Sequence, residues 1–249
     1  MNGSMLRGYK RSMTSSDSYP DEGRVLVITG ASTGIGEAAA CAAVAAGWRV
    51  ALAARSLDRL EMLSQKLGGP DIALPVRCDV REWDDVAELA SRTRASFGRI
   101  DAGFANAGFG AERGFEKSTP EHWRDMVLTN VYGCALTIRA LLPALRETRG
   151  HMLLTSSTAG RRVLPGSLYS STKFAVSAMG EALRQEVADT GIRVSLIAPG
   201  MTDTPFFDNG VPDWSLTSDD IARAVMYALE QPPHVNVSEV VVRPTAQTL

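Results

Sequence analysis

The chain has 249 residues, of which 45% are hydrophobic and 22% charged, a balance typical of a globular protein with a sizeable core. Its formal net charge of −2 and its pI of about 6.0 give no indication of a nucleic-acid-binding surface, so we expect no nucleic-acid partner. Three cysteines and three histidines are scattered along the sequence without the spacing of a metal site, so we expect reduced thiols and no metal.

The N-terminal stretch, residues 1–22, has neither an apolar core nor a periodic pattern. This predicts a flexible N-terminal tail in front of a single domain over residues 23–249. The tail lacks the continuous apolar region of a signal peptide, although its basic, Ser-rich start leaves an organelle-targeting segment as an alternative. We find no apolar run of membrane-spanning length in the sequence. The prediction is a cytoplasmic protein without membrane contact.

Short apolar runs alternate with longer helical patterns along the rest of the chain. Strands are expected at residues 25–29, 48–54, 72–78, 100–105, 152–156, 192–197 and 237–242, and helices at residues 36–46, 57–67, 82–97, 121–147, 169–188 and 217–230. The strands are continuously apolar, which is typical of a parallel sheet covered by helices on both faces. We therefore expect a single-domain α/β fold, a doubly wound parallel sheet of about seven strands.

Polar or glycine-rich residues follow each of the first six predicted strands. In a doubly wound sheet, ligands bind at the carboxyl ends of the strands, so these residues are expected to meet at one site. They are Gly30–Gly36, Arg55, Asp79, Asn106–Gly108, Ser157 and Pro199–Gly200.

The segment TGASTGIG, residues 29–36, lies between the first strand and the first helix. Its glycines allow a tight turn and a close approach of the backbone to a pyrophosphate, while the helix N-terminus offers unpaired N–H groups. Glycine-rich turns also occur for steric reasons alone. In this strand-turn-helix context, however, the segment predicts a nucleotide-binding turn.

Six signatures occur in order between about residue 24 and residue 245: TGxxxGIG at 29–36, NAG at 106–108, Asn130, a serine after the fifth strand, YxxxK at 169–173 and PG at 199–200. Together they resemble the classical short-chain dehydrogenase/reductase family, which has a Rossmann fold. The loop between the serine and Tyr169 is one residue shorter than is usual in the family. The C-terminal segment EVVVRPTAQ resembles the branch of NADP-dependent 3-hydroxy acid and serine dehydrogenases.

Tyr169 and Lys173 are four positions apart, so they share one face if the segment is helical. A free tyrosine has a pKa of about 10 and is a poor base at neutral pH. A nearby ammonium favours the phenolate, so we expect Lys173 to lower the pKa of Tyr169 toward the working pH. The resemblance implies that Lys173 also holds the ribose of a nicotinamide cofactor.

Two further positions complete the expected catalytic set. Ser157 is expected to hydrogen-bond the substrate oxygen, with Ser156 as the alternative because of the shortened loop. Asn130, inside the long predicted helix, is either a polar residue satisfied in the core or, as the resemblance implies, the ligand of a water in a proton relay.

The predicted reaction is hydride transfer between a nicotinamide cofactor and a small-molecule secondary alcohol or carbonyl compound. A non-catalytic NADP(H)-binding redox sensor or scaffold on the same fold is the alternative, because a fold does not fix a function. A different reaction on the same scaffold, such as an isomerisation or a dehalogenation, is a third possibility, disfavoured by the intact nicotinamide-site pattern.

The second strand ends in Ala54-Arg55-Ser56, without the acidic residue that accepts the ribose hydroxyls of NAD. Because arginine pairs with a 2′-phosphate, this pattern predicts NADP(H). With the contacts that the resemblance implies, the expected cofactor-binding residues are Gly30, Ser32, Thr33, Gly34, Ile35, Gly36, Arg55, Ser56, Asp79, Val80, Asn106, Ala107, Gly108, Tyr169, Lys173, Pro199, Gly200, Met201 and Thr204.

The segment 202–215, with Phe206, Phe207 and Trp214, is either a substrate lid or a set of aromatics packed on the protein body or a partner. Phe109 is a candidate pocket wall. The pair at residues 161–162, both arginines, either receives an acidic substrate or is solvated. By the resemblance, the helices at 121–147 and 169–188 imply a homodimer or homotetramer.

Overall fold

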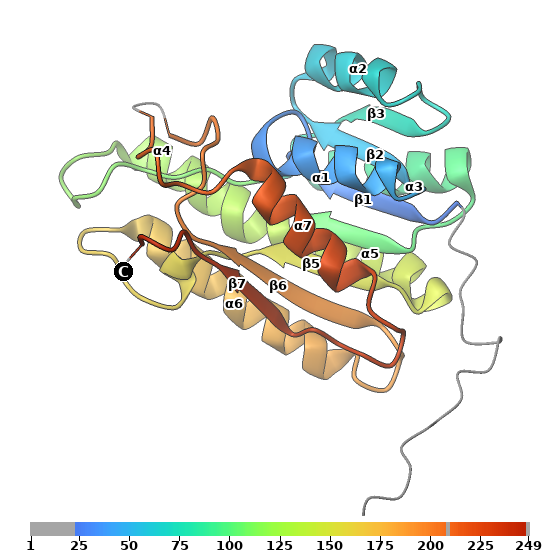
Figure 1. Ribbon diagram of the computed structural model, residues 1–249. Coiled ribbons are helices and arrows are strands. Elements are labelled where there is room, and N and C mark those ends of the chain that lie inside the picture. Colours follow the sequence, from blue (N-terminus) through green and yellow to red (C-terminus); the bar gives the residue numbers. More distant parts are fainter. Residues whose placement is uncertain (1–22, 208–209, 248–249) are drawn as a thin grey trace, which may run out of the picture.

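The computed structural model describes residues 23–207 and 210–247. The tail predicted over residues 1–22 lies outside the described residues. Seven parallel strands form one sheet in the order β3-β2-β1-β4-β5-β6-β7 (Figure 1). They are β1 (Val25–Thr29), β2 (Arg49–Ala54), β3 (Ala73–Arg77), β4 (Ala102–Ala105), β5 (His151–Thr155), β6 (Arg193–Pro199) and β7 (Glu239–Val242). The predicted doubly wound sheet is confirmed, and its order reverses between β1 and β4.

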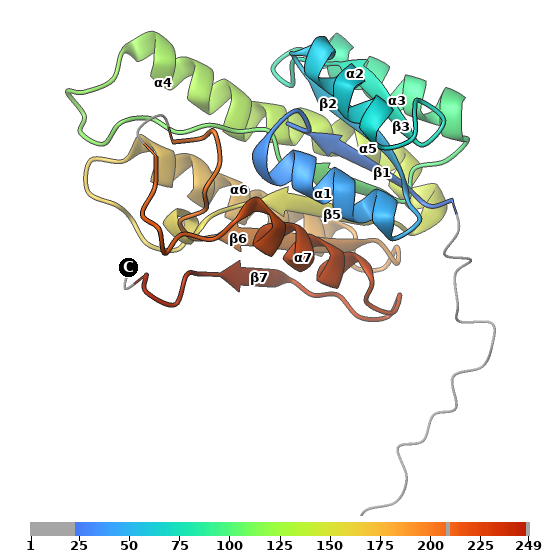
Figure 2. The same ribbon diagram turned by 45° about the horizontal axis from the view of Figure 1, so that its top comes forward.

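Helices cover both faces of the sheet, as Figures 1 and 2 show. One face packs against α1 (Gly34–Ala45), α2 (Leu57–Lys66) and α7 (Ser218–Leu229), and the other against α3 (Trp83–Phe97), α5 (Gly133–Thr148) and α6 (Leu168–Glu186). Each layer has its own apolar core, because the strands between them bury side chains on both faces. This arrangement leaves the edge with the carboxyl ends of the strands free for a site.

The helix expected over residues 121–147 has three parts: α4 (Pro120–Val127), the π-helical segment η1 (Leu128–Tyr132) and α5. Its predicted start is confirmed, since Thr119 caps α4 and accepts a hydrogen bond from the backbone N–H of His122. The π-helical turn was not predicted. Such turns are frequent at functional sites, and this one contains Asn130, which is 2% exposed.

By length and composition, the continuous helical stretch Pro120–Thr148 could cross a membrane, which the sequence analysis had not found. A single helix of this kind is weak support for membrane insertion, because core helices of soluble proteins have the same properties. Here the α5 part packs against α3 and β4, with Leu141 and Leu145 buried in the core. We therefore treat the stretch as a core helix.

Hydrogen bonds of Thr29 join the two halves of the sheet where the strand order reverses. The Thr29 hydroxyl, at the end of β1, accepts from the backbone N–H groups of Asn106 (3.1 Å) and Ala107 (3.2 Å), which follow β4. The side-chain amide of Asn106 donates in return to the Thr29 carbonyl, at 3.1 Å. Thr29 is 1% exposed, so no water competes for these bonds. The glycine turn and the 106–108 turn are thereby held side by side.

We expect Thr29→Val, which preserves the shape of the side chain, to lower the free energy of unfolding by about 2 kcal/mol, because it leaves two partly buried N–H groups without their acceptor. Thr29→Ser keeps the oxygen and loses one methyl, at a cost of about 1 kcal/mol. Urea unfolding of both variants measures the difference. A valine variant as stable as the wild type would contradict this account.

Candidate active site

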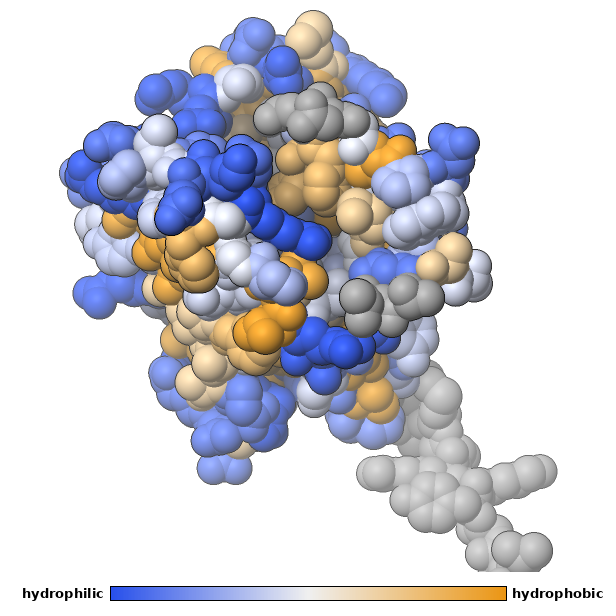
Figure 3. Space-filling model, turned by 90° about the vertical axis from the view of Figure 1, so that its left-hand side faces the viewer, coloured by the Kyte–Doolittle hydropathy of each residue, from blue (hydrophilic) through white to orange (hydrophobic). Residues whose placement is uncertain are grey.

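A cavity of about 1040 Å³ opens at the carboxyl edge of the sheet, a size at the upper end of small-molecule sites. Figure 3 faces this edge and shows a hollow with apolar and hydrophilic side chains along its rim. Every expected catalytic and cofactor-binding residue lines this cavity except Gly36 and Asn130. Among the described residues, no group of three His, Cys, Asp or Glu side chains is placed to bind a metal ion.

The glycine turn brings the N-terminus of α1 to the cavity. Gly30 and Gly34 have φ values of 68° and 57°, in the left-handed region that favours glycine. A Cβ on Gly36 would lie 2.2 Å from the Gly30 carbonyl oxygen, so Gly36 allows the helix to pack onto the turn instead of lining the site. Thr33 precedes the helix and makes no side-chain capping bond. The first N–H groups of α1 thus suit an anion such as a pyrophosphate.

Cationic side chains gather at the end of the cavity beside β2. Arg55 and Ser56 follow β2, and Arg59 lies one turn into α2. Among the described residues, neither arginine forms an ion pair with a carboxylate, and Ser56 makes no side-chain capping bond to α2. Arg59 was not predicted, although its four-residue spacing from Arg55 was visible in the sequence. These three side chains fit a phosphate group.

Asp79 and Val80, which follow β3, line the same end of the cavity. The carboxylate of Asp79 accepts hydrogen bonds from the Arg81 guanidinium at 2.7–3.1 Å, and Arg81 also pairs with Asp125 at 2.9 Å. The guanidinium of Arg81 lowers the pKa of Asp79. The Asp79 carboxylate is therefore fixed in the cavity wall, with its negative charge balanced by Arg81.

Tyr169, Lys173 and Ser157 converge at the centre of the cavity. Tyr169 is the second residue of α6, and it lines the cavity together with Ser157, whose side chain lowers the Tyr169 pKa. One turn further on, Lys173 places its Nζ 5.7 Å from the centroid of the Tyr169 ring and 2.7 Å from the carbonyl oxygen of Thr155. Lys173 is 4% exposed. The shortened loop still brings the serine against the tyrosine.

The expectation that Lys173 lowers the pKa of Tyr169 is not met. Burial disfavours the charged form of each group, raising the pKa of Tyr169 to about 12 and lowering the pKa of Lys173 to about 8. The Ser157 side chain acts in the opposite direction on the Tyr169 pKa but does not outweigh burial. In this structure Tyr169 is a protonated phenol, which suits it to donate a proton.

The two neighbouring serines have different surroundings. Ser156 is 1% exposed, and its Oγ lies 2.7 Å from the Oγ of Ser177 on α6. The Ser157 hydroxyl instead accepts from the backbone N–H of Ala159, donates to the Pro199 carbonyl at 3.4 Å and acts on the pKa of Tyr169. Adjacent residues of an extended chain point in opposite directions, so only one of the two can meet the tyrosine. This geometry favours Ser157 for the role expected of it.

Asn130 uses its side chain to hold the turn after β4. Its Oδ1 accepts from the backbone N–H of Phe109 (3.0 Å), and its Nδ2 donates to the Phe109 carbonyl (2.9 Å) and to Thr172 (3.1 Å). A Cβ on Gly108 would lie 3.0 Å from Asn130 Oδ1 and 3.7 Å from Lys173 Nζ, so the three residues are close together. These bonds agree with the first alternative for Asn130, a polar residue satisfied in the core. Its role in a proton relay stays a prediction.

Comparisons with known proteins agree with this geometry. The family model described as short chain dehydrogenase matches residues 24–213. Dehydrogenase/reductase SDR family member 11 of Gallus gallus is 35% identical over 248 residues, covering 90% of this chain and 97% of that protein. The chain belongs to the short-chain dehydrogenase family.

Solved structures of other members show the same fold. An alcohol dehydrogenase from the archaeon Thermococcus sibiricus, complexed with 5-hydroxy-NADP, is 35% identical with a TM-score of 0.84, covering 90% of this chain and 97% of that one. Serine dehydrogenase from Escherichia coli is 29% identical with a TM-score of 0.82, covering 90% and 100%. The resemblance drawn from the six sequence signatures is confirmed.

Aromatic side chains of the 202–215 segment close over the tyrosine of this short-chain dehydrogenase. The Phe206 ring meets the Tyr169 ring edge-on with centroids 5.4 Å apart, and Phe207 packs on Phe206 at 4.8 Å. A Cβ on Gly110 would lie 2.6 Å from the Phe206 ring, so the glycine makes room for it. Phe206, Phe207 and Trp214 all line the cavity, which favours the lid over packing elsewhere on the protein.

The C-terminal segment was not predicted to contribute to the site. Gln247 lines the cavity, and its Oε1 accepts from the backbone N–H of Met201 at 2.9 Å. A Cβ on Gly200 would lie 2.3 Å from that oxygen, so only glycine at 200 permits the contact. Gln247 thereby fixes the turn at residues 199–201. A lone polar residue near the chain end carries no sequence signal for such a role.

Proposed function

We propose that this short-chain dehydrogenase is an NADP(H)-dependent oxidoreductase that interconverts a secondary alcohol and a carbonyl compound. The observation that carries the proposal is the convergence of Ser157, Tyr169 and buried Lys173 in one cavity, which also contains the open N-terminus of α1. A cofactor-binding protein without turnover has no need of a proton donor at this point.

The nicotinamide cofactor supplies or accepts the hydride. The chain's own groups handle the proton and the oxygen. During reduction, Ser157 donates a hydrogen bond to the carbonyl oxygen, and Tyr169 transfers its proton to that oxygen as negative charge develops there. Lys173 provides positive charge one helical turn from the tyrosine, which stabilises the phenolate left behind. Asn130 holds the turn at residues 108–109 against the lysine. Oxidation follows the same path in reverse.

The preference for NADP(H) follows from the residues after β2. Ala54 leaves no carboxylate to repel a 2′-phosphate, and the cationic Arg55 and Arg59 line the cavity with the hydroxyl of Ser56 between them. Arginine binds phosphate bidentately, which gives both affinity and orientation. The N-terminus of α1 and the turn after β6 fit the remainder of the dinucleotide.

We also propose that the protein is a cytoplasmic homodimer or homotetramer. The outer side of α4, η1 and α6 carries partly exposed large apolar side chains, among them Val127, Tyr132 and Phe174. Large exposed apolar side chains on neighbouring helices are typical of subunit interfaces. The three cysteines are free thiols in the structure, as suits a reducing compartment.

The experiment that tests the reaction is Tyr169→Phe. We expect loss of carbonyl reduction by about a thousandfold, because the variant lacks the proton donor, with NADPH affinity nearly unchanged. Ser156→Ala is the matched control, since that hydroxyl faces Ser177, and it should keep most of the activity. The measurement is kcat with NADPH over a panel of ketones, alongside NADPH binding. Binding without turnover by the wild type across the panel would instead favour a redox sensor.

The cofactor preference is tested by two single substitutions. We expect Ala54→Asp to shift kcat/KM toward NAD, because the new carboxylate repels a 2′-phosphate and accepts a 2′-hydroxyl. We expect Arg55→Ala to weaken NADP by about tenfold while sparing NAD. If the wild type prefers NAD, or if neither substitution changes the ratio of the two kcat/KM values, the cofactor assignment is wrong.

The pH dependence should differ between the two directions. Reduction uses the protonated phenol of Tyr169, whose pKa is raised to about 12, so its kcat/KM should not fall through loss of that proton between about pH 6 and about pH 8. Oxidation requires the phenolate, and its fraction below the pKa grows by about tenfold per pH unit. The kcat/KM for alcohol oxidation should therefore rise across the same range. Parallel profiles in both directions would contradict this role for the tyrosine.

A further inference from the structure

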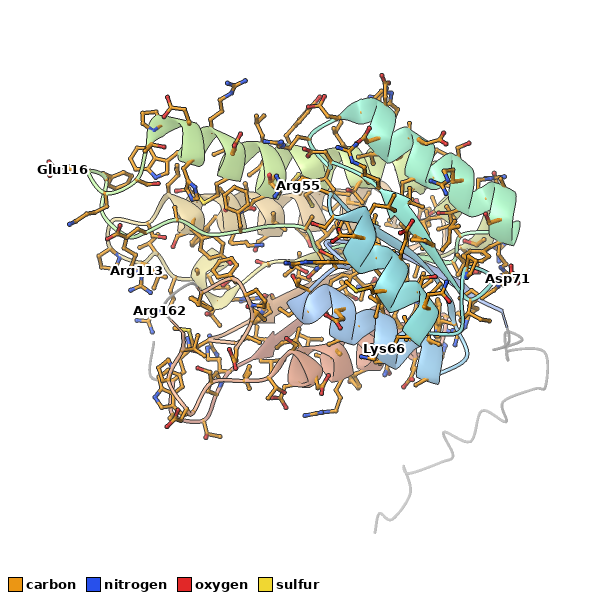
Figure 4. The ribbon with its side chains drawn as sticks, turned by 90° about the horizontal axis from the view of Figure 1, so that it is seen from above. Arg55, Lys66, Asp71, Arg113, Glu116 and Arg162 are labelled. Carbon is orange, nitrogen blue, oxygen red and sulfur yellow. The ribbon has the colours of Figure 1, made fainter. Side chains whose placement is uncertain are left out.

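Two arginines from separate loops lie on one rim of the cavity. Arg113 belongs to the loop over residues 106–119, and Arg162 follows the short 3-10 helix η2 (Thr158–Gly160). The backbone N–H of Gly114 donates to the carbonyl of Gly166 at 2.8 Å, which joins the two loops. Figure 4 shows both arginines at the same end of the molecule, well apart from Arg55. The cavity therefore has a second cationic end.

Arg161, the neighbour of Arg162, differs from it in being held by an ion pair. It forms an ion pair with Glu239 on β7 and does not line the cavity. Arg162 has no ion pair with any carboxylate among the described residues, and the same holds for Arg113. The two neighbouring arginines therefore differ: Arg161 is paired with the sheet, and Arg162 lines the cavity.

The carboxylates described along the cavity do not neutralise this rim. They are Asp79 and Asp125, and both are paired with Arg81 at the opposite end. Glu112 and Glu116 are close to Arg113 in sequence but are exposed and do not line the cavity, and Figure 4 places Glu116 at the outer tip of the loop. Two guanidinium groups without a described counter-charge attract an anionic ligand.

Apolar side chains occupy the part of the cavity between this rim and the tyrosine. Leu164, Phe206 and Phe207 line it, and Val163 and Trp214 line it although both remain exposed to solvent. Large apolar side chains exposed at the mouth of a cavity favour a ligand that covers them. The combination is an apolar wall that ends in positive charge.

We propose that the substrate carries a carboxylate bound by Arg113 and Arg162, joined to its reacting carbonyl by an apolar or aromatic body that contacts the wall. The position of the reacting carbonyl at Tyr169 rests on the proposed function, whereas the anion site rests only on the cavity. A bidentate contact of a guanidinium with a carboxylate fixes the orientation of such a ligand as well as its affinity.

The test compares aryl keto acids with their methyl esters, which replace the carboxylate at the distal end by an uncharged ester. 4-Acetylbenzoate, (4-acetylphenyl)acetate and 3-(4-acetylphenyl)propanoate, in which the aromatic ring lies between the carbonyl and the carboxylate, form a ladder of lengths. We measure their dissociation constants by calorimetry on the full-length protein with NADP+ present, and reduction of the same compounds with NADPH. The variants are Arg113→Gln, Arg162→Gln and the double variant, with Arg161→Gln as the matched control from the same loop.

We expect at least one acid to bind about tenfold more tightly than its ester, a preference that either cavity variant weakens and the double variant abolishes. Arg161→Gln should keep it. Equal or weaker binding of every acid, or an equal loss in Arg161→Gln, would overturn the anion site even if the ketones are reduced. Selective binding of acids without any reduction would instead leave the anion site intact and contradict the proposed reaction.

Discussion

The site depends on one set of hydrogen bonds, the buried contacts of Thr29 with the two residues that follow β4. A parallel sheet that reverses its order must separate the loops on either side of the reversal, and the ligand crevice forms there. If the two strand ends moved apart, the glycine turn and the 106–108 turn would no longer share a wall. Asn130 extends the same connection to α6 through Phe109 and Thr172, so the tyrosine and lysine are held to the same frame.

Burial then decides the chemistry at the centre. Tyr169 ionises to an anion and Lys173 to a cation, and removal from water favours the neutral form of each. The pKa of Tyr169 is therefore raised and that of Lys173 lowered. The Lys173 ammonium donates one hydrogen bond to the Thr155 carbonyl, at 2.7 Å, which fixes the position of Nζ beside α6. Its Nζ lies 5.7 Å from the centroid of the Tyr169 ring, one helical turn away. A site that keeps the phenol protonated is poised for reduction, and any added positive charge in the cavity shifts it toward oxidation.

The order of strands and helices could be predicted because it depends on local apolar runs and on glycine turns, both of which are visible in the sequence. The contributions of Gln247 and Arg113 could not be predicted, because each depends on a distant backbone group. Gln247 accepts from the Met201 N–H, and the loop with Arg113 is placed by the bond from the Gly114 N–H to the Gly166 carbonyl. The π-helical turn around Asn130 was missed for a related reason. Its extra residue is stabilised by tertiary hydrogen bonds and leaves the helical apolar pattern on both sides unbroken.

The direction of the pKa of Tyr169 shows where sequence reasoning fails in a more general way. A spacing of four predicts that two side chains share a helix face, but it gives no information on how far the surrounding protein excludes water from them. On an exposed helix the ammonium would dominate and the phenol would become more acidic. Here Phe206 meets the tyrosine ring edge-on and Gly110 makes room for it, so the segment that lines the cavity over Tyr169 also contributes to the burial that raises its pKa. The cover over the tyrosine and the raised pKa of its phenol are therefore two consequences of one packing arrangement.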